Sequence, residues 1–383
     1  MNEWKRYKLN EIASLSNGIN FDKSAYTSGV KLIGVADFKD RVYPDYGSLQ
    51  EVDSKVVRNG DYLEKGDIVF VRSNGNKELV GRCMMIDRDI PVTFSGFCIK
   101  LHLIDKNKFE PAYFNYLFRT REFKKVMTGT AVGANIQNLS QSRLGNCEIN
   151  VPNIETQREL AIIISRYDSL IENYQKQIKL LEESAQRLYK EWFIDLHFPG
   201  HENTKIVDGV PEGWDKKKVG DVTPIKTGKK DANFGTNDGP FPFFTCAQEP
   251  IKAPSYSFDT NAVILAGNGD FNVKLYRGKF EAYQRTYVLE PINDKMLYLL
   301  YFCIAENMKR LAIEASGSTI KFLTKGMIEN LVINEPSTIV LDSFNQIIEP
   351  IRTQKEKLIS QIHHLTEARD RLLPKLMSGE IAV

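Results

Sequence analysis

The sequence of 383 residues lacks the features that mark several classes of protein. Its five cysteines are an odd number, lie far apart and include no C-x-x-C pair, which argues against a disulfide framework and against a zinc site. No apolar run approaches the ~18 residues that a membrane span needs. The first residues, MNEWKRYKLN, lack the apolar core of a signal peptide, so we expect a cytoplasmic protein.

The chain also lacks an excess of charge of either sign. Its 51 Lys and Arg residues face 49 Asp and Glu residues, which leaves a formal charge of +2. A surface that binds nucleic acid must therefore come from local clustering of basic residues. Hydrophobic residues make up 42% and charged residues 26%, which is ordinary for a folded protein and excludes wholesale disorder.

Motifs for common catalytic chemistry are missing as well. The sequence has no G-x-x-x-x-G-K-[ST] phosphate loop, no complete G-x-G-x-x-G loop and no Pro-Pro of an adenine-methylating loop. One stretch, Pro44-Asp45 followed by Asp53-Ser54-Lys55, fits the loose pattern of Mg²⁺-dependent nucleases. This pattern is so permissive that we expect an exposed charged loop, and the second half of the chain has nothing equivalent. We assign no catalytic residue and no metal ligand, and keep a nuclease as the alternative function.

The second half of the chain repeats the first. A shift of 184 positions aligns 136–192 with 320–376 without a gap, and 15 of the 57 aligned pairs are identical. About three or four identities would be expected by chance at ordinary composition. Further correspondences upstream are Trp4 with Trp214 and Ile68–Val71 with Val263–Ala266. The chain is therefore a duplication of one unit, in which a globular part precedes a segment of about 45 residues.

Each repeat ends in a segment with the apolar spacing of a long coiled-coil helix. From 160 to 192 the apolar positions follow steps of three and four residues with one stutter, and they include Ile163 and Leu170. The equivalent seam from 344 to 376 keeps eight of its ten positions apolar and includes Ile347 and Gln354. Pro350 should kink or restart the second helix, and Pro374 should end it.

Two such seams in one chain can bury each other as an intramolecular antiparallel coiled coil. That arrangement would place one globular domain at each end of the helix pair, related by a pseudo-twofold axis. The alternative is that each helix packs only on its own domain.

The predicted fold class is α+β, with two mixed α/β domains separated by the two long helices. Strands are expected at Asp67–Val71, Val80–Ile86 and Phe97–Leu103, with counterparts at Val263–Ala266 and Phe271–Tyr276. The predicted boundaries are 1–151 for the first domain, 152–197 for the first helix, 198–213 for a linker, 214–336 for the second domain, and 337–383 for the second helix and C-terminal tail.

Polar and basic residues in the loops of both halves predict a nucleic-acid surface. The candidates are Arg72, Asn74, Lys77, Arg82, Asn135, Gln137 and Asn138 in the first half, and Lys229, Lys230, Asn268, Asn272, Lys274, Arg285, Thr319 and Lys321 in the second. Arg and Lys pair with phosphates or guanine edges, whereas Asn and Gln pair with adenine edges. Ordinary solvated turns are the alternative for any one residue, but the recurrence of similar loops in both halves favours a binding surface.

Several stretches resemble the specificity (S) subunit of type I restriction–modification enzymes. They are Ile136-Gln-Asn-Leu-Ser140 with Ile149-Asn-Val-Pro152, Gln157-Arg-Glu-Leu-Ala161, Leu188-Tyr-Lys-Glu-Trp-Phe193 and Leu372-Leu-Pro-Lys-Leu-Met-Ser-Gly-Glu-Ile381. The likeness covers essentially the whole chain, and it is stronger in the helical segments than in the globular domains.

The resemblance implies a DNA-recognition subunit with no catalytic site of its own. Each globular part would be a target-recognition domain that reads one half of a split, asymmetric site in double-stranded DNA, and the helices would fix the gap between the half-sites. Two methyltransferase (M) subunits would bind the chain and methylate adenine N6 with S-adenosylmethionine, and two restriction (R) subunits would add ATP- and Mg²⁺-dependent cleavage. No cofactor is expected on this chain and no membrane is implied. A coiled-coil adaptor with no role at DNA is a further alternative.

Overall fold

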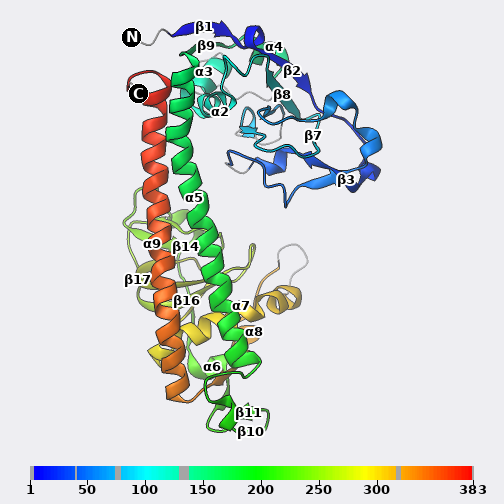
Figure 1. Ribbon diagram of the computed structural model, residues 1–383. Coiled ribbons are helices and arrows are strands. Elements are labelled where there is room, and N and C mark those ends of the chain that lie inside the picture. Colours follow the sequence, from blue (N-terminus) through cyan, green and yellow to red (C-terminus); the bar gives the residue numbers. More distant parts are fainter. Residues whose placement is uncertain (1–3, 39–40, 74–78, 129–137, 316–320, 382–383) are drawn as a thin grey trace. The chain divides into compact units, whose positions relative to one another are not determined.

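The computed structural model describes residues 4–38, 41–73, 79–128, 138–315 and 321–381 (Figure 1). It divides into two compact units, and each unit takes a part of both long helices. The first unit holds Met1–Gln175 with Ser360–Val383, and the second holds Lys176–Ile359. Among the described residues, no helix combines the length and the apolar character that crossing a membrane requires.

The first unit contains two small sheets and a two-stranded ribbon. Its strands are β1 (Lys5–Lys8), β2 (Ala13–Asn17), β3 (Tyr26–Ile33), β4 (Gln50–Val52), β5 (Ile68–Val71), β6 (Cys83–Met85), β7 (Val92–Phe94), β8 (Cys98–Leu103) and β9 (Glu148–Val151). Its helices are α1 (Leu9–Ile12), α2 (Pro111–Arg119), α3 (Arg121–Thr128), α4 (Gln141–Gly145), the first part of α5 (Ile154–Tyr189) and the last part of α9 (Thr338–Met377). The strand orders are β2-β8-β5-β6 and β4-β3-β7, and β1 pairs with β9.

The predicted strands of the first half are confirmed as β5, β6 and β8. Strand β5 reads IVFV, and all four side chains are buried. Since successive side chains of a strand point to opposite faces, such an uninterrupted apolar run requires cover on both sides. Ile68 and Phe70 belong to the core that contains helix α2, and Val69 and Val71 belong to a second core with Phe94.

The second unit is built around one sheet of six strands. Its strands are β10 (Ile206–Val207), β11 (Val210–Pro211), β12 (Asp215–Lys218), β13 (Ile225–Thr227), β14 (Phe241–Phe244), β15 (Ile251–Ala253), β16 (Phe258–Ala266), β17 (Val273–Ala282), β18 (Thr286–Leu289) and β19 (Val332–Glu335). The helices are α6 (Val219–Val222), α7 (Leu297–Glu314), α8 (Lys325–Glu329) and the remaining parts of α5 and α9. The sheet order is β13-β18-β16-β17-β14-β15, and β12 pairs with β19. The strands predicted in this half are confirmed as β16 and β17, which form an antiparallel hairpin.

The duplication seen in the sequence is also a duplication of backbone structure. In both units a short strand, β1 or β12, runs directly into a one-turn helix, α1 or α6. The first amide of each helix bonds to an equivalent carbonyl just before the partner strand of the ribbon. Leu9 N donates to Cys147 O at 3.1 Å, and Val219 N donates to Leu331 O at 2.8 Å. Gly18 and Gly228 are equivalent as well. A Cβ on Gly18 would lie 2.3 Å from the Phe94 carbonyl oxygen, and one on Gly228 would lie 2.0 Å from the Ala282 carbonyl oxygen. Only glycine fits either position.

Within each unit, the parts of helices α5 and α9 run antiparallel (Figure 1). Within the first unit, Asp168 of α5 pairs with Arg369 of α9 at 2.6 Å. Within the second unit, Glu182 of α5 pairs with Lys355 of α9 at 2.5 Å. In the same unit Trp192 lies against Phe344, with ring centroids 5.9 Å apart. Within this unit the residue numbers therefore rise along α5 as they fall along α9, which confirms the predicted antiparallel pairing.

The observed seam is shifted by one residue from the predicted seam at two positions of each helix, 163 and 170 in α5 and 347 and 354 in α9. Leu170 is 39% exposed and Ile347 is 43% exposed, whereas the neighbouring Ile171 and Ile348 are 9% and 2% exposed. The residues turned inward are 157, 160, 164, 167, 171, 174, 178, 181, 185, 188 and 192, with equivalents from 341 to 376. These positions alternate steps of three and four throughout, so the predicted stutter is wrong and both seams follow an unbroken heptad repeat.

The predicted restart at Pro350 and the predicted end at Pro374 are also wrong, whereas a kink at Pro350 stays a prediction. Helix α9 runs unbroken through Pro350 and past Pro374 to Met377. Proline removes one amide and crowds the carbonyl four residues earlier. Those carbonyls belong to Gln346 and Asp370, which are both exposed, so water can take the hydrogen bond that each proline removes.

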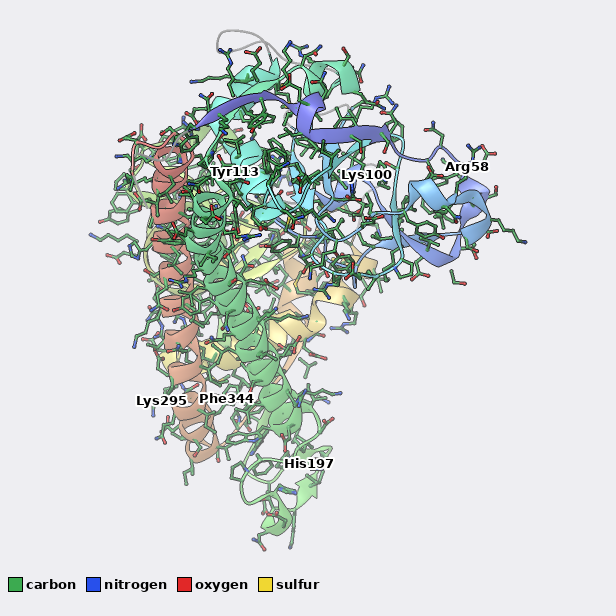
Figure 2. The ribbon with its side chains drawn as sticks, turned by 45° about the horizontal axis from the view of Figure 1, so that its top comes forward. Arg58, Lys100, Tyr113, His197, Lys295 and Phe344 are labelled. Atoms are coloured by element: carbon green, nitrogen blue, oxygen red, sulfur yellow. The ribbon has the colours of Figure 1, made fainter. Side chains whose placement is uncertain are left out.

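In each unit, the parts of α5 and α9 are anchored in a globular core. Leu160 and Ile164 of α5 share a core with Leu376 of α9 and with helix α2. In the second unit Phe344 of α9, labelled in Figure 2, is fully buried, and its ring packs edge-on against Phe193 with centroids 4.8 Å apart. The helices therefore pack on each other and also on the globular parts.

The segment 198–213, predicted as a linker, contains ordered structure. Strands β10 and β11 pair in a small hairpin, and Phe198 is buried with its ring centroid 4.8 Å from that of Trp214. This contact attaches the segment to the core of the second unit.

Candidate nucleic-acid interface

The described candidates of the second half gather at one end of the six-stranded sheet. Backbone hydrogen bonds join the loops that carry them. Gln284 N donates to Lys230 O at 2.9 Å, Gly267 N donates to Arg285 O at 2.9 Å, and Leu323 N donates to Gly267 O at 2.8 Å. Asn268 also forms a bridge with Phe322. Residues that are separated by almost 100 positions in the sequence are thereby brought to one edge.

This edge, which we call the second loop edge, carries several basic side chains. Its residues are Lys229, Lys230, Asn268, Asn272, Lys274, Arg285 and Lys321. The side chains of Lys229, Arg285 and Lys321 are exposed, and those of Lys230, Asn268, Asn272 and Lys274 are half-buried. Five of the seven are basic, and basic side chains at loop ends are suited to contacts with phosphates.

Two of these residues serve the loop itself. Asn272 donates through Nδ2 to the carbonyl oxygens of Asp270 at 2.6 Å and Cys246 at 3.1 Å, and Lys274 donates through Nζ to Ala247 O at 2.9 Å. Burial lowers the pKa of Lys274. We therefore interpret Asn272 and Lys274 as residues that hold the loop in shape, and the exposed Arg285 and Lys321 as the better candidates for contact with a ligand.

The first unit contains the same loop junction. Leu139 N donates to Arg72 O at 2.8 Å, and Ser73 forms a bridge with Asn138. Leu139 is the sequence equivalent of Leu323. The backbone hydrogen bond that joins two loops of the second unit, from Leu323 N to Gly267 O, therefore has a counterpart here. The structure thus brings Arg72 and Asn138 together. Asn74, Lys77, Asn135 and Gln137 of the first half, and Thr319 of the second, lie outside the described residues.

Arg82 lies in a different environment from Arg72. It lines a cavity with Arg119 of α2, Asp168 of α5 and Arg369 of α9. Its backbone still supports the loop, since Val71 N donates to Arg82 O at 2.9 Å. The structure therefore does not group the Arg82 side chain with Arg72 and Asn138.

Two exposed aromatic rings beside these loops were missed by the sequence analysis. Phe97 is 60% exposed, and its carbonyl oxygen accepts from Arg72 N at 2.8 Å. Phe322 is 39% exposed and forms the bridge with Asn268. Both stand in alternating patterns that are typical of buried strand residues, so the sequence alone offers no signal for their exposure. Exposed rings next to basic loops can stack on bases or wedge between base steps.

Arg277 is attached to the long helix rather than to the loop edge. It donates from both terminal nitrogens to Glu349 of α9, at 2.9 and 3.0 Å, and its second terminal nitrogen also donates to Tyr298 Oη at 2.9 Å. Tyr298 in turn donates to Glu349 Oε2 at 2.5 Å. This closed triangle fixes hairpin β16–β17 to α9 within the second unit.

The residues of the nuclease alternative have local structural roles. Asp45 pairs with Arg41, four residues before it, at 2.8 Å. Asp53 caps the short turn that follows it by accepting from Lys55 N at 2.9 Å. Over the part of the chain that the structure describes, no three His, Cys, Asp or Glu side chains are grouped so as to hold a metal ion.

Comparison with protein families gives a single result for both halves of the chain. The family model described as the type I restriction modification DNA specificity domain matches residues 1–183 and again residues 211–358. The chain belongs to this family. The two matches reproduce the duplication, since the first covers one globular part and most of α5, and the second covers the other globular part and about half of α9.

The relatives of this chain are named as specificity subunits of type I restriction enzymes. It is 39% identical over 176 residues to the type I restriction enzyme EcoDI specificity subunit of Escherichia coli, a match that spans 45% of this chain and 39% of that protein. It is 29% identical over 316 residues to the MjaIX specificity subunit of Methanocaldococcus jannaschii, across 74% of this chain and 72% of that protein. These matches give no support to the nuclease alternative.

A solved structure has the same fold. The type I restriction–modification S subunit from M. genitalium superposes with a TM-score of 0.61 at 16% identity, covering 98% of this chain and 96% of that one. The similarity confirms two mixed α/β domains on a pair of long helices.

Proposed function

We propose that this chain recognises DNA sequence for a type I restriction–modification enzyme, with each globular part reading one half of a split site. The observation that carries the proposal is the repeated loop junction, between Arg72 and Leu139 in one unit and between Gly267 and Leu323 in the other. The surrounding loops differ in sequence between the units. Two domains with the same backbone arrangement and different loops are suited to bind two different half-sites. The full site would then have an asymmetric sequence.

The long helices are suited to set the distance between the half-sites. Helix α9 has 40 residues, which corresponds to about 60 Å at ~1.5 Å per residue. Two modules joined by a stiff spacer bind more tightly than either alone, because the second contact is intramolecular. We expect half-sites about one DNA turn, ~34–36 Å, apart.

The chemistry belongs, in this proposal, to partner proteins. Two methyltransferase (M) subunits with S-adenosylmethionine would modify adenine, and two restriction (R) subunits with ATP and Mg²⁺ would cleave DNA. The chain itself would be non-catalytic and would work in the cytoplasm. Its formal charge of only +2 favours a division of labour in which the partner supplies part of the phosphate contacts.

The test is a change of the exposed Arg285 side chain in the chain bound to its methyltransferase partner. Arg285→Ala should weaken recognition at one half-site only, by about 1–3 kcal/mol if the guanidinium contacts a base. The readout is methylation of a pool of DNA targets that vary in one half-site at a time. Lys279→Ala is the matched control, because Lys279 is an exposed cation of the same sheet on strand β17 and is not part of the second loop edge.

The outcomes separate the alternatives. An equal loss of methylation on every target would mean that Arg285 contacts a phosphate and not a base. The slope of the logarithm of the DNA-binding constant against the logarithm of the salt concentration should then be smaller by about one in the variant. No effect of Arg285 together with no salt-dependent DNA binding by the complex would favour the coiled-coil adaptor.

A further inference from the structure

A four-residue turn has the same backbone structure in both units. It joins β7 to β8 in the first unit and β17 to β18 in the second. Its third residue is Phe97 in the first unit and Arg285 in the second. Four pairs of equivalent backbone hydrogen bonds establish this correspondence. Two pairs are Cys98 N to Ser95 O at 2.9 Å with Thr286 N to Tyr283 O at 2.8 Å, and Ser95 N to Ile33 O at 2.9 Å with Tyr283 N to Phe244 O at 3.0 Å. The other two are Gly18 N to Cys98 O at 3.3 Å with Gly228 N to Thr286 O at 3.1 Å, and Arg72 N to Phe97 O at 2.8 Å with Gly267 N to Arg285 O at 2.9 Å.

These hydrogen bonds fix the backbone on both sides of the third residue, which we call the turn position. The carbonyl oxygen of Phe97 also accepts from Ser73 N at 3.4 Å. Phe97 is 60% exposed, and Arg285 is exposed as well. A side chain on a fixed turn can meet a partner with little loss of backbone conformational entropy. The turn position is therefore suited to present a side chain to a binding partner in both units.

A second pair of equivalent residues belongs to the same loops, and we call their place the junction position. Asn138 and Phe322 correspond at the shift of 184 positions, and both are exposed. Asn138 forms a bridge with Ser73, and Phe322 forms one with Asn268. At the turn and junction positions together, each unit thus presents one exposed phenylalanine and one exposed polar side chain, with their places exchanged. Singly exposed apolar residues are common on protein surfaces, so it is the exchange on a repeated backbone that points to a shared use of the ring.

Basic side chains lie next to both rings. In the first unit Arg72 donates through Nη1 to Gly96 O at 3.4 Å, which places its guanidinium against the turn that carries Phe97. In the second unit the exposed Lys321 directly precedes Phe322. An apolar ring beside cations fits double-stranded DNA, which presents flat base faces and phosphates close together. A protein partner that covered the ring with apolar side chains would bury the neighbouring cations without a counter-charge, which is costly.

We propose that Phe97 inserts its ring between two neighbouring base pairs of the half-site that the first unit binds, and that Phe322 does the same in the other half-site. This inference rests on the proposed DNA-recognition function. A phenylalanine wedge partly unstacks a base step and kinks the duplex. Pyrimidine–purine steps deform most readily, so each half-site should contain such a step where the ring enters. The rings thus select sequence through the deformability of DNA, whereas Arg285 is suited to read a base edge.

The first test measures DNA binding by the chain in complex with its methyltransferase partner, on duplexes that carry the site this complex methylates. Phe97→Ala should weaken binding by roughly 5- to 150-fold, which is the loss expected for one stacked ring. The dependence of binding on salt concentration should stay the same, because a phenylalanine neutralises no phosphate. Ile104→Ala is the matched control and should leave binding unchanged. Ile104 is 62% exposed and follows strand β8, which Phe97 precedes, so it lies at the opposite end of the same strand.

The second test detects the unstacked step itself with the adenine analogue 2-aminopurine, whose fluorescence rises when it loses its stacking neighbours. The analogue replaces, one at a time, the adenines on either strand of the first half-site other than the methylated adenine. Extrusion of the target base by the methyltransferase then does not contribute to the signal. Binding of the unaltered complex should raise the fluorescence at one step. Phe97→Ala should abolish this rise, and Phe322→Ala should leave it in place and abolish the equivalent rise in the second half-site.

The outcomes separate this inference from the proposed function. Unchanged DNA binding by Phe97→Ala would overturn the inference and leave the recognition function standing. Weaker DNA binding with no fluorescence rise at any step of the unaltered complex would mean that the ring contacts DNA without entering it, which also overturns the insertion. Weaker association of Phe97→Ala with the methyltransferase, at unchanged DNA affinity of the complex, would assign the ring to the protein partner instead. The absence of salt-dependent DNA binding by the unaltered complex would overturn both the function and the inference.

Discussion

Two neighbouring isoleucines of α9 give a direct test of the helix seam. Ile348 is 2% exposed in the core of the second unit, and Ile347 is 43% exposed. The predicted seam places Ile347 inside and the observed seam places Ile348 inside. Because the two residues are identical and adjacent, replacing each by alanine changes the same atoms in the same helix.

The expected magnitudes differ severalfold. Ile348→Ala removes buried methyl and methylene groups and leaves a cavity, which costs about 2–5 kcal/mol. Ile347→Ala removes atoms that largely contact water, and alanine is the better helix former by a few tenths of a kcal/mol, so the net cost should stay below ~1 kcal/mol.

Urea unfolding followed by tryptophan fluorescence provides the assay. Trp192 and Trp214, two of the three tryptophans, lie in the core that contains Ile348. With a slope of ~2 kcal/mol per molar urea, a loss of ~3 kcal/mol lowers the midpoint by about 1.5 M for Ile348→Ala. Equal shifts for the two variants, or a larger shift for Ile347→Ala, would refute the observed seam.

Two further predictions follow from ionisable groups. Hydrogen bonds from Arg277 lower the pKa of Glu349, so the stability that this carboxylate contributes is complete above its unfolded pKa of ~4.3 and is lost as the pH falls through the folded pKa. The difference in urea midpoint between the unaltered chain and Glu349→Gln should therefore be constant from neutral pH to about pH 5 and should shrink at lower pH. A difference that stays constant at all pH values would contradict this prediction. Burial raises the pKa of Cys83 to about 11 and that of Cys303 to about 12, whereas Cys246 is half-exposed. Titration of the native protein with a thiol reagent should therefore label Cys246 first. A Cys246→Ser control identifies this fast-reacting thiol. Rapid labelling of that control would contradict the buried placement of the other thiols.

The sequence predicted the large features because they repeat. Fifteen identities at a fixed shift of 184 locate the helices and the repeat core, and the heptad spacing predicts their pairing. The exact seam was predicted wrongly where apolar residues stand side by side, at Ile163-Ile164 and Ile347-Ile348. The first member of each pair gives a seam with a stutter, and the second gives an unbroken heptad repeat. The burial of Ile348 in the core of the second unit agrees with the second choice.

The candidate interface was predictable in part for a similar reason. The loops that carry Arg72, Asn268 and Lys321 are marked by glycine and polar residues in both halves. The sequence could not show that Arg277 pairs with Glu349, which is 72 positions away. Long-range ion pairs leave no periodic signal, and the same is true of the exposure of Phe97.

The measurement that tests the central claim most directly is the N6-methyladenine map of the host genome, with the methyltransferase partner expressed, in the presence and absence of this gene. The account predicts a split, asymmetric motif that disappears on deletion, and that returns changed in one half only when the Arg285→Ala allele is supplied. A map that is identical with and without the gene while the partner is active would contradict the account.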